Sequence, residues 1–243
     1  IADDFEQVFQ QQTAQYGFLK EQTYADILNE QVYVATEGEI VGQINGLSVI
    51  EYPGTPVAFG EPSRISCIVQ FGDGEVVDVE RKNELAGNLH SKGMMIAQAC
   101  LSNILDLPSQ LPFSASLVFE QSYGEIDGDS ASLAIFCVLV SALADLPLPQ
   151  HIAITGAIDQ FGLVHAVGSV NDKIEGFFSI CQRRGLTGKQ GVIIPATTIQ
   201  QLSLSDEVVE AVKNGEFFIF PVEDIYQTCE LIFQRDLLEE EGF

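Results

Sequence analysis

The chain has 243 residues, and its 35 acidic side chains outnumber its 11 lysines and arginines, which gives a net charge of −24. Such a charge repels nucleic acid and anionic membrane surfaces, so neither is an expected partner. A helix that crosses a bilayer needs about 18 apolar residues in a row, and the sequence has no such run.

Residues 1–30 are polar and acidic, with scattered aromatic residues, and they favour a helix. Because the chain starts at Ile1, we interpret it as part of a longer polypeptide, in which residues 1–30 connect an upstream module. The pattern changes at Gln31, and we expect residues 31–243 to form one domain.

The first part of this domain is rich in Val and Ile between Gly, Pro and Asp turns, which is typical of strands. Strands are predicted over residues 32–36, 39–52 and 64–71. The Asp-Gly pair within residues 71–76 predicts a hairpin turn.

Helices and strands then alternate to the end of the chain. Residues 84–104 show helical spacing, 114–122 favour a strand, and 131–145 are apolar on nearly all sides, which predicts a buried helix. The remaining predicted elements are a hairpin from 151–158 and 163–167, a helix over 171–185, a strand over 190–196, a helix over 205–214, a strand over 217–221 and a helix over 222–235. This order predicts an α+β fold with N-terminal β-hairpins followed by a mixed sheet covered by helices.

The five cysteines are odd in number, widely spaced, and set mostly among apolar neighbours, without a Cys-x-x-Cys pair. They therefore indicate buried, reduced thiols and a reducing compartment such as the cytoplasm. The three histidines show no metal-ligand spacing, so no metal site is expected.

The most informative segment is YGEIDGDSAS, residues 123–132. Ser130 follows a strand and a turn and precedes the buried helix, so free backbone N–H groups and the positive end of the helix dipole would surround it. Such N–H groups can stabilise the oxyanion of an acyl transfer. Gly128 would allow a tight turn there. The simpler interpretation is that Ser130 or Asp129 only caps the helix.

A nucleophilic serine needs a base, and the residues leave two candidates open. His165 lies in a plausible central strand, although no Gly-x-Ser-x-Gly elbow is present. Lys173 is the alternative, because it starts a helix among large apolar residues. Burial and a helix N-terminus both lower a lysine pKa from about 10.4. Taken alone, Lys173 has the simpler interpretation of a solvated surface lysine.

Three stretches taken together resemble the peptidase domain of the Lon protease family. They are DGDSAS at residues 127–132, ITGAI at 154–158 and AVGSVNDK at 166–173. The aspartate before the serine is similar to the B-type branch of that family. The resemblance covers roughly residues 31–243 and implies a Lon-type fold, with Ser130 as nucleophile and Lys173 as general base. It also implies that Thr155 orients the lysine amine.

The sequence departs from the family pattern at two positions. The family usually has proline at the position of Ala166 and glycine at that of Ser169. Both positions shape the turn before Lys173. Asp127 and Asp129 flank Ser130, and they either interact with the helix N-terminus or pair with Lys173 in a resting site.

The resemblance implies protein or peptide substrates, a homohexameric ring, and an ATPase module that uses ATP and magnesium. This chain lacks a Gly-x-x-x-x-Gly-Lys-Ser/Thr motif, so we expect no cofactor within it.

Three other functions remain open from the residues. They are a catalytically silent oligomerisation or interaction module on the same fold, an amidase for small amides, and a nucleotide-dependent kinase. The kinase is disfavoured, because no phosphate-binding glycine loop is present.

Overall fold

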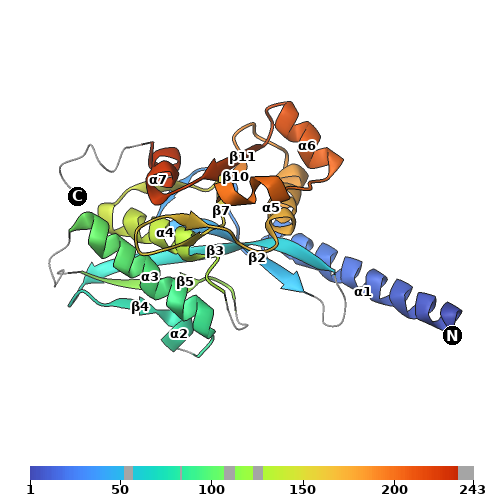
Figure 1. The fold of residues 1–243 in the computed structure, drawn as a ribbon, viewed down its shortest axis with the longest axis horizontal. Coiled ribbons are helices and arrows are strands. Elements are labelled where there is room, and N and C mark those ends of the chain that lie inside the picture. The colour runs from blue at the N-terminus through green and yellow to red at the C-terminus, as the bar shows by residue number, and fades with distance from the viewer. Residues whose placement is uncertain (52–56, 83, 107–112, 123–127, 235–243) are drawn as a thin grey trace.

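A computed structural model describes residues 1–51, 57–82, 84–106, 113–122 and 128–234. A seven-stranded mixed sheet runs through the molecule, and helices cover both of its faces (Figure 1). Two small two-stranded sheets, β1–β6 and β8–β9, lie beside it. The α+β class predicted from the sequence is confirmed.

The large sheet has the strand order β11-β10-β7-β2-β3-β5-β4. Strands β11, β10, β7 and β2 run parallel, β3 is antiparallel to both β2 and β5, and β4 is parallel to β5. The strands are β1 (Glu39–Val41), β2 (Gln43–Glu51), β3 (Ala58–Phe71), β4 (Val76–Asp78), β5 (Phe113–Phe119), β6 (Pro147–Pro149), β7 (Ile152–Ile154), β8 (Ala157–Ile158), β9 (Val164–His165), β10 (Gly191–Pro195) and β11 (Phe218–Val222).

The helices follow the apolar periodicity of the sequence and end where the pattern breaks. Helix α5 ends before Gly185, whose φ of +98° suits glycine, and α6 is capped by the Ser205 hydroxyl, which accepts a bond from Val208 N. The helices are α1 (Ala2–Leu28), α2 (Val79–Lys82), α3 (Asn88–Leu105), α4 (Ser132–Ala144), α5 (Val170–Arg184), α6 (Asp206–Lys213) and α7 (Ile225–Phe233), with the short 3-10 helix η1 (Ala196–Gln201).

Alternate residues of the central strands face two different hydrophobic clusters. In β10, Ile193 packs into the cluster that contains α4, whereas Val192 and Ile194 pack into the cluster that contains α5. The α4 cluster also includes residues of α3 and α7, and the α5 cluster includes residues of α6. Helices α4 and α5 therefore cover opposite faces of the sheet.

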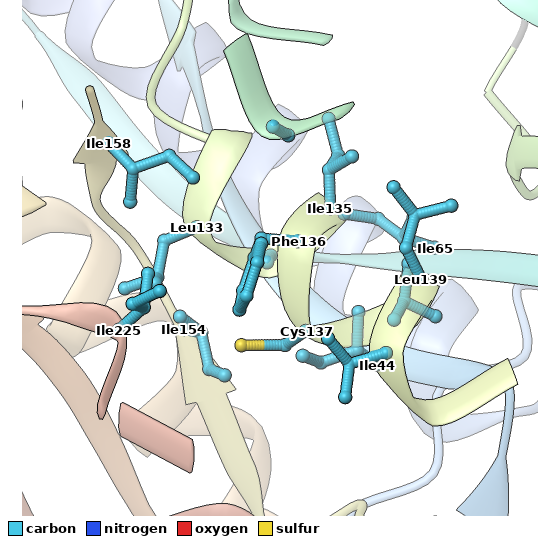
Figure 2. Packing of buried hydrophobic residues seen from close by; sticks show 14 of the residues in the cluster. Ile44, Ile65, Leu133, Ile135, Phe136, Cys137, Leu139, Ile154, Ile158 and Ile225 are labelled. Carbon is cyan, nitrogen blue, oxygen red and sulfur yellow. The ribbon is translucent and has the colours of Figure 1, made fainter. Parts of the chain in front are cut away.

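Helix α4 is the centre of the larger cluster. Its side chains from Ser132 to Ser141 are all buried. Figure 2 shows Phe136 and Cys137 of α4 among isoleucines of the neighbouring strands. A helix buried on all sides cannot shift without opening cavities, so the start of α4 is a rigid position.

Helix α1 packs on the body only through its C-terminal half, where Tyr16, Tyr24 and Ile27 are buried. The first ten residues of the chain are exposed, and Figure 1 shows this end of α1 extending away from the sheet. Among the described residues, no helix is long and apolar enough to span a membrane.

Three expectations about the strands were wrong, one about the existence of a strand and two about pairing. Residues 32–36 form an irregular segment and no strand. The turn after β3 leads to β4, but β4 pairs in parallel with β5, so residues 71–76 do not close a hairpin. Residues 151–158 supply β7 to the large sheet, and only β8 pairs with β9. Local turn signals do not specify which distant strand a segment joins.

Candidate active site

Ser130, Thr155 and Lys173 come from three elements that meet at one end of strand β7. Ser130 lies two residues before α4, Thr155 directly follows β7, and Lys173 lies in the first turn of α5. Because α4 and α5 cover opposite faces, the end of β7 is where residues from both helices can approach each other. The ends of parallel strands commonly carry functional sites for this reason.

Backbone hydrogen bonds hold Ser130 against the segment that carries Thr155. Gly156 N donates to Ser130 O at 3.0 Å, and Leu133 N donates to Gly156 O at 3.1 Å. Thr155 N in turn donates to Ile193 O of β10 at 3.0 Å. The position of Ser130 is therefore fixed relative to Thr155 by the main chain.

The turn before Ser130 contains the two neighbours singled out from the sequence. Gly128 has a φ of +89°, a conformation that favours glycine. Asp129 is exposed, and its Cβ would lie 3.1 Å from a Cβ added at Gly93 of α3. Asp127 lies outside the described residues.

Lys173 is a buried lysine, with 5% of its surface exposed. Its Nζ donates to Thr155 Oγ1, which lies 3.3 Å away and is itself fully buried. Burial disfavours the ammonium and lowers the pKa of Lys173 from 10.5 to about 8, while the nearby Asp129 carboxylate acts in the opposite direction. Near physiological pH a minor fraction of Lys173 is therefore neutral, as a general base must be, whereas a lysine with its ordinary pKa would be almost fully charged.

The start of α5 is held in an unusual conformation. Ser169 caps the helix in the left-handed region, with φ of +56°, where glycine is favoured. Strand β3 also passes very close to this turn, because a Cβ added at Gly60 would overlap the Asp172 carbonyl and lie 2.7 Å from Lys173 Cα. A Cβ at Gly176 would overlap the carbonyl group of Gly60. These two glycines let the helix and the strand meet backbone to backbone.

Ser130 and Lys173 both line one cleft of about 940 Å³. Its walls are formed by β2, by β3 beyond Gly60, by the segment after β5, and by the turn before α5. The lining includes residues 32–34, 46–51, 61–65, 119–122, 128–131 and 166–169, with Lys173. A volume of this size accommodates several residues of an extended peptide.

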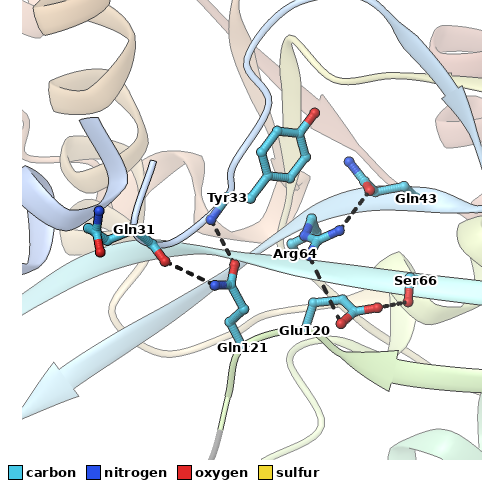
Figure 3. A network of polar contacts seen from close by, with 7 residues as sticks. All are labelled: Gln31, Tyr33, Gln43, Arg64, Ser66, Glu120 and Gln121. Atoms are coloured by element: carbon cyan, nitrogen blue, oxygen red, sulfur yellow. Dashed lines mark hydrogen bonds and ion pairs between the residues drawn. The ribbon is translucent and has the colours of Figure 1, made fainter. Parts of the chain in front are cut away.

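One wall of the cleft is a polar network, drawn in Figure 3. Gln121 donates to Gln31 O at 3.0 Å and accepts from Tyr33 N at 2.7 Å. Arg64 lies 5.0 Å from the centre of the Tyr33 ring, donates to Gln43 Oε1 at 3.3 Å and approaches Glu120 at 4.0 Å. The network joins the segment after α1 to the end of β5.

His165 lies elsewhere. It is exposed on β9, its Nε2 is 2.8 Å from Asp159 Oδ2, and it is not among the described residues that line the cleft. No group of three or more His, Cys, Asp or Glu in the described part of the chain could hold a metal ion.

In the described part of the chain, Ser130 Oγ and Lys173 Nζ form no direct hydrogen bond, and Nζ donates to Thr155 instead. Catalytic hydrogen bonds are often long before substrate binds and shorten in the complex. What the site offers is a hydroxyl at the start of a buried helix and a desolvated amine held by a threonine, with both groups open to one cleft.

Sequence reasoning missed the residues that shape this site from β3. Gly60 lies inside a strand, where an isolated glycine signals a close backbone approach, and that signal was available. Glu61, the next residue, lines the cleft. Nothing in its local sequence pattern distinguishes it from the other glutamates of the chain.

Comparison with known proteins gives one family match and several relatives. Residues 123–235 match the family model of the Lon protease (S16) C-terminal proteolytic domain. A putative Lon protease homolog of Haemophilus influenzae is 90% identical over 98% of this chain and 40% of its own length. One of Escherichia coli is 60% identical over 93% of the chain and 38% of its own length. An archaeal Lon protease of Methanocaldococcus jannaschii is 32% identical over 81% of the chain and 28% of its own length. The chain thus spans well under half of each relative.

Proposed function

The chain belongs to the Lon protease family through its proteolytic domain, and we propose on that premise that it is a serine endopeptidase with a Ser130–Lys173 dyad. The observation that carries the assignment of roles is the environment of Lys173. It is a buried lysine with a pKa of about 8, held by Thr155, in the cleft that Ser130 also lines. A solvated surface lysine is not buried, and its pKa stays at about 10.4.

In the proposed reaction, neutral Lys173 accepts the hydroxyl proton as Ser130 Oγ attacks the peptide carbonyl carbon. Backbone N–H groups at residues 128–131 stabilise the oxyanion, and the positive end of the α4 helix dipole stabilises the same negative charge. The lysine ammonium then donates its proton to the leaving amine, and an acyl-enzyme remains. Lys173 then deprotonates a water molecule, which attacks the ester carbon. As the bond between this carbon and Ser130 Oγ breaks, the Lys173 ammonium returns the proton to Ser130 Oγ and the carboxylic acid product leaves.

Two substitutions test these roles. Ser130→Ala should abolish cleavage of an unstructured peptide and leave the thermal unfolding of the protein unchanged. Lys173→Met should also abolish cleavage, whereas His165→Ala should cleave at the parent rate, because His165 lies outside the cleft. Full activity of the Ser130→Ala variant would refute the proposal, and loss of activity in His165→Ala alone would favour a histidine base.

We extend the proposal to the setting in which the domain works. The relatives are named as a putative Lon protease homolog and an archaeal Lon protease, and both are more than twice as long as this chain. ATP-dependent unfolding by an additional module, a homohexameric ring and protein substrates are the corresponding proposals for the complete protein. All five cysteines are free and buried, which fits a reducing compartment such as the cytoplasm.

A catalytically silent module on the same fold is the second candidate. The observation in its favour is Ser169, because a non-glycine residue in the left-handed region before Lys173 adds strain at the turn that positions the base. Reaction with a serine-directed electrophile separates the two functions. An active dyad should be labelled at Ser130, and a silent module should not be labelled.

A further inference from the structure

The charged residues of the cleft are unevenly balanced. Its lining carries the acidic residues Glu51, Glu61, Glu120 and Asp129 and the basic residues Arg64 and Lys173. Lys173 is buried beside Thr155, and the charge of Asp129 is close enough to raise its pKa against the effect of burial. Its amine donates to Thr155 Oγ1, and as the proposed general base it does not serve as a cation for an acidic substrate residue.

Arg64 is also engaged by the protein itself. Its guanidinium lies over the Tyr33 ring, donates to Gln43 and approaches Glu120, as Figure 3 shows. Ser66 Oγ donates to the other oxygen of the Glu120 carboxylate at 2.8 Å. The charges of Arg64 and Glu120 therefore offset each other within this wall of the cleft.

Glu61 differs from Glu120 in its partners, because Glu120 approaches Arg64, whereas the hydrogen-bond partner of the Glu61 carboxylate among the described residues is a hydroxyl. In the register of β2 and β3 it lies opposite Ser48, whose hydroxyl hydrogen-bonds its carboxylate. Ser48 Oγ also lies 2.9 Å from Ser63 Oγ. Among the described residues, no lysine or arginine forms an ion pair with Glu61.

The environment of Glu61 disfavours an unpaired charge. Burial raises the pKa of Glu61, with the Ser48 hydrogen bond acting against this effect. A half-buried carboxylate with one hydroxyl partner gains most from the arrival of a cation, because the cation replaces the lost hydration. Glu61 follows Gly60, which contacts the backbone at Lys173, so the carboxylate belongs to the strand that borders the dyad.

We propose that the cleft selects peptides carrying a lysine or arginine close to the cleaved bond, and that Glu61 receives this cationic side chain. The inference rests on the peptidase function proposed above and adds the substrate class. Glu51, at the end of β2 in the same lining, adds to the negative potential. With the net charge of −24, the field around the molecule also favours the approach of basic segments.

The test uses sets of fluorogenic peptides and the complete protein. Within a set, the peptides are identical except at one position, which is Lys, Met or Glu, and this position is moved along both sides of the cleaved bond. At the best position, kcat/KM should be at least about tenfold higher for Lys than for Glu, as expected when a buried polar partner is satisfied. Glu61→Gln keeps the shape and the Ser48 contact, and it should remove most of this ratio.

Glu39→Gln is the matched control, because it removes one charge from β1 outside the cleft and should keep the ratio. Equal cleavage of the Lys and Glu peptides at every position would overturn the inference, as would an unchanged ratio in Glu61→Gln. If that cleavage still requires Ser130, the peptidase function stands and only the charge preference fails.

A binding measurement keeps the inference testable without turnover. The complete protein carrying Ser130→Ala is titrated into labelled Lys and Glu peptides, and anisotropy gives Kd. The Lys peptide should bind about tenfold more tightly, and adding Glu61→Gln should bring the two Kd values together. Equal Kd values before that substitution would overturn the preference. Absence of any Ser130-dependent cleavage by the parent protein would refute the peptidase function separately.

Discussion

Replacing Lys173 by methionine should stabilise the protein at neutral pH while it removes activity. The native state holds this lysine in a buried position that lowers its pKa from 10.5 to about 8. At about 1.4 kcal/mol for each pH unit, this difference corresponds to about 3 kcal/mol of lost stability. Methionine has a similar length and no charge to desolvate, so it does not bear this cost.

The sign of the pH dependence follows from linkage. Below pH 8 the lysine is protonated in both the folded and the unfolded state, so the full destabilisation is present. As the pH rises from about 8 to 10.5 the folded state is already neutral, and the difference disappears once the unfolded state also loses its proton. The advantage of Lys173→Met should therefore decline across this range.

Denaturant unfolding of both proteins at pH 7 and near pH 10 measures this effect. The difference in unfolding free energy should shrink by about 2–3 kcal/mol between the two conditions. Lys213→Met, at an exposed site on α6, is the control and should show no such change. A difference that does not depend on pH would refute the reasoning, because any packing advantage of methionine is the same at both pH values.

Three further outcomes are expected. Thr155→Val should lower kcat about tenfold or more with little change in KM, and Thr155→Ser should restore most of it, because the hydroxyl that accepts from Lys173 is kept; equal rates for both variants would argue against orientation by Thr155. Ser169→Gly should raise the unfolding free energy by about 1 kcal/mol, since glycine adopts φ of +56° without strain; a lower melting temperature would contradict this. Burial raises the pKa of Glu80, so its charged form destabilises the fold above that pKa. Glu80→Gln should therefore raise the unfolding free energy at pH 8 and lose this advantage near pH 4; an advantage that is equal at both pH values would contradict this prediction.

The elements of the fold that the sequence predicts well are those that a continuous local run of apolar residues specifies. The helix of residues 131–145 and the strand of 190–196 are apolar on all sides, and they appear as α4 and β10. Pairing across the sheet was not predictable in the same way, because it depends on long-range register. The placement of β4 beside β5 is the clearest case.

The residues of the candidate site also fall into two groups, those that a local motif reveals and those that only the folded structure brings together. Ser130, Thr155 and Lys173 are recognisable because each lies in a short motif, and the fold brings all three to the end of β7. Glu61 and the Arg64 network belong to a wall assembled from β3, the end of β5 and the segment after α1. No local pattern could reveal that wall, since its partners are far apart along the chain.

The contact between Gly60 and Gly176 has a consequence for how this protein can vary. Neither residue needs to touch a substrate, yet even an alanine methyl group at either position would overlap the other element's backbone. Saturation mutagenesis should therefore find both positions as intolerant as Ser130, in a screen for cleavage. They should differ from Ser130 in a screen for folding, because a serine-to-alanine change leaves the backbone path intact. Comparing the two screens would separate the residues that perform chemistry from those that bring a strand and a helix together around it.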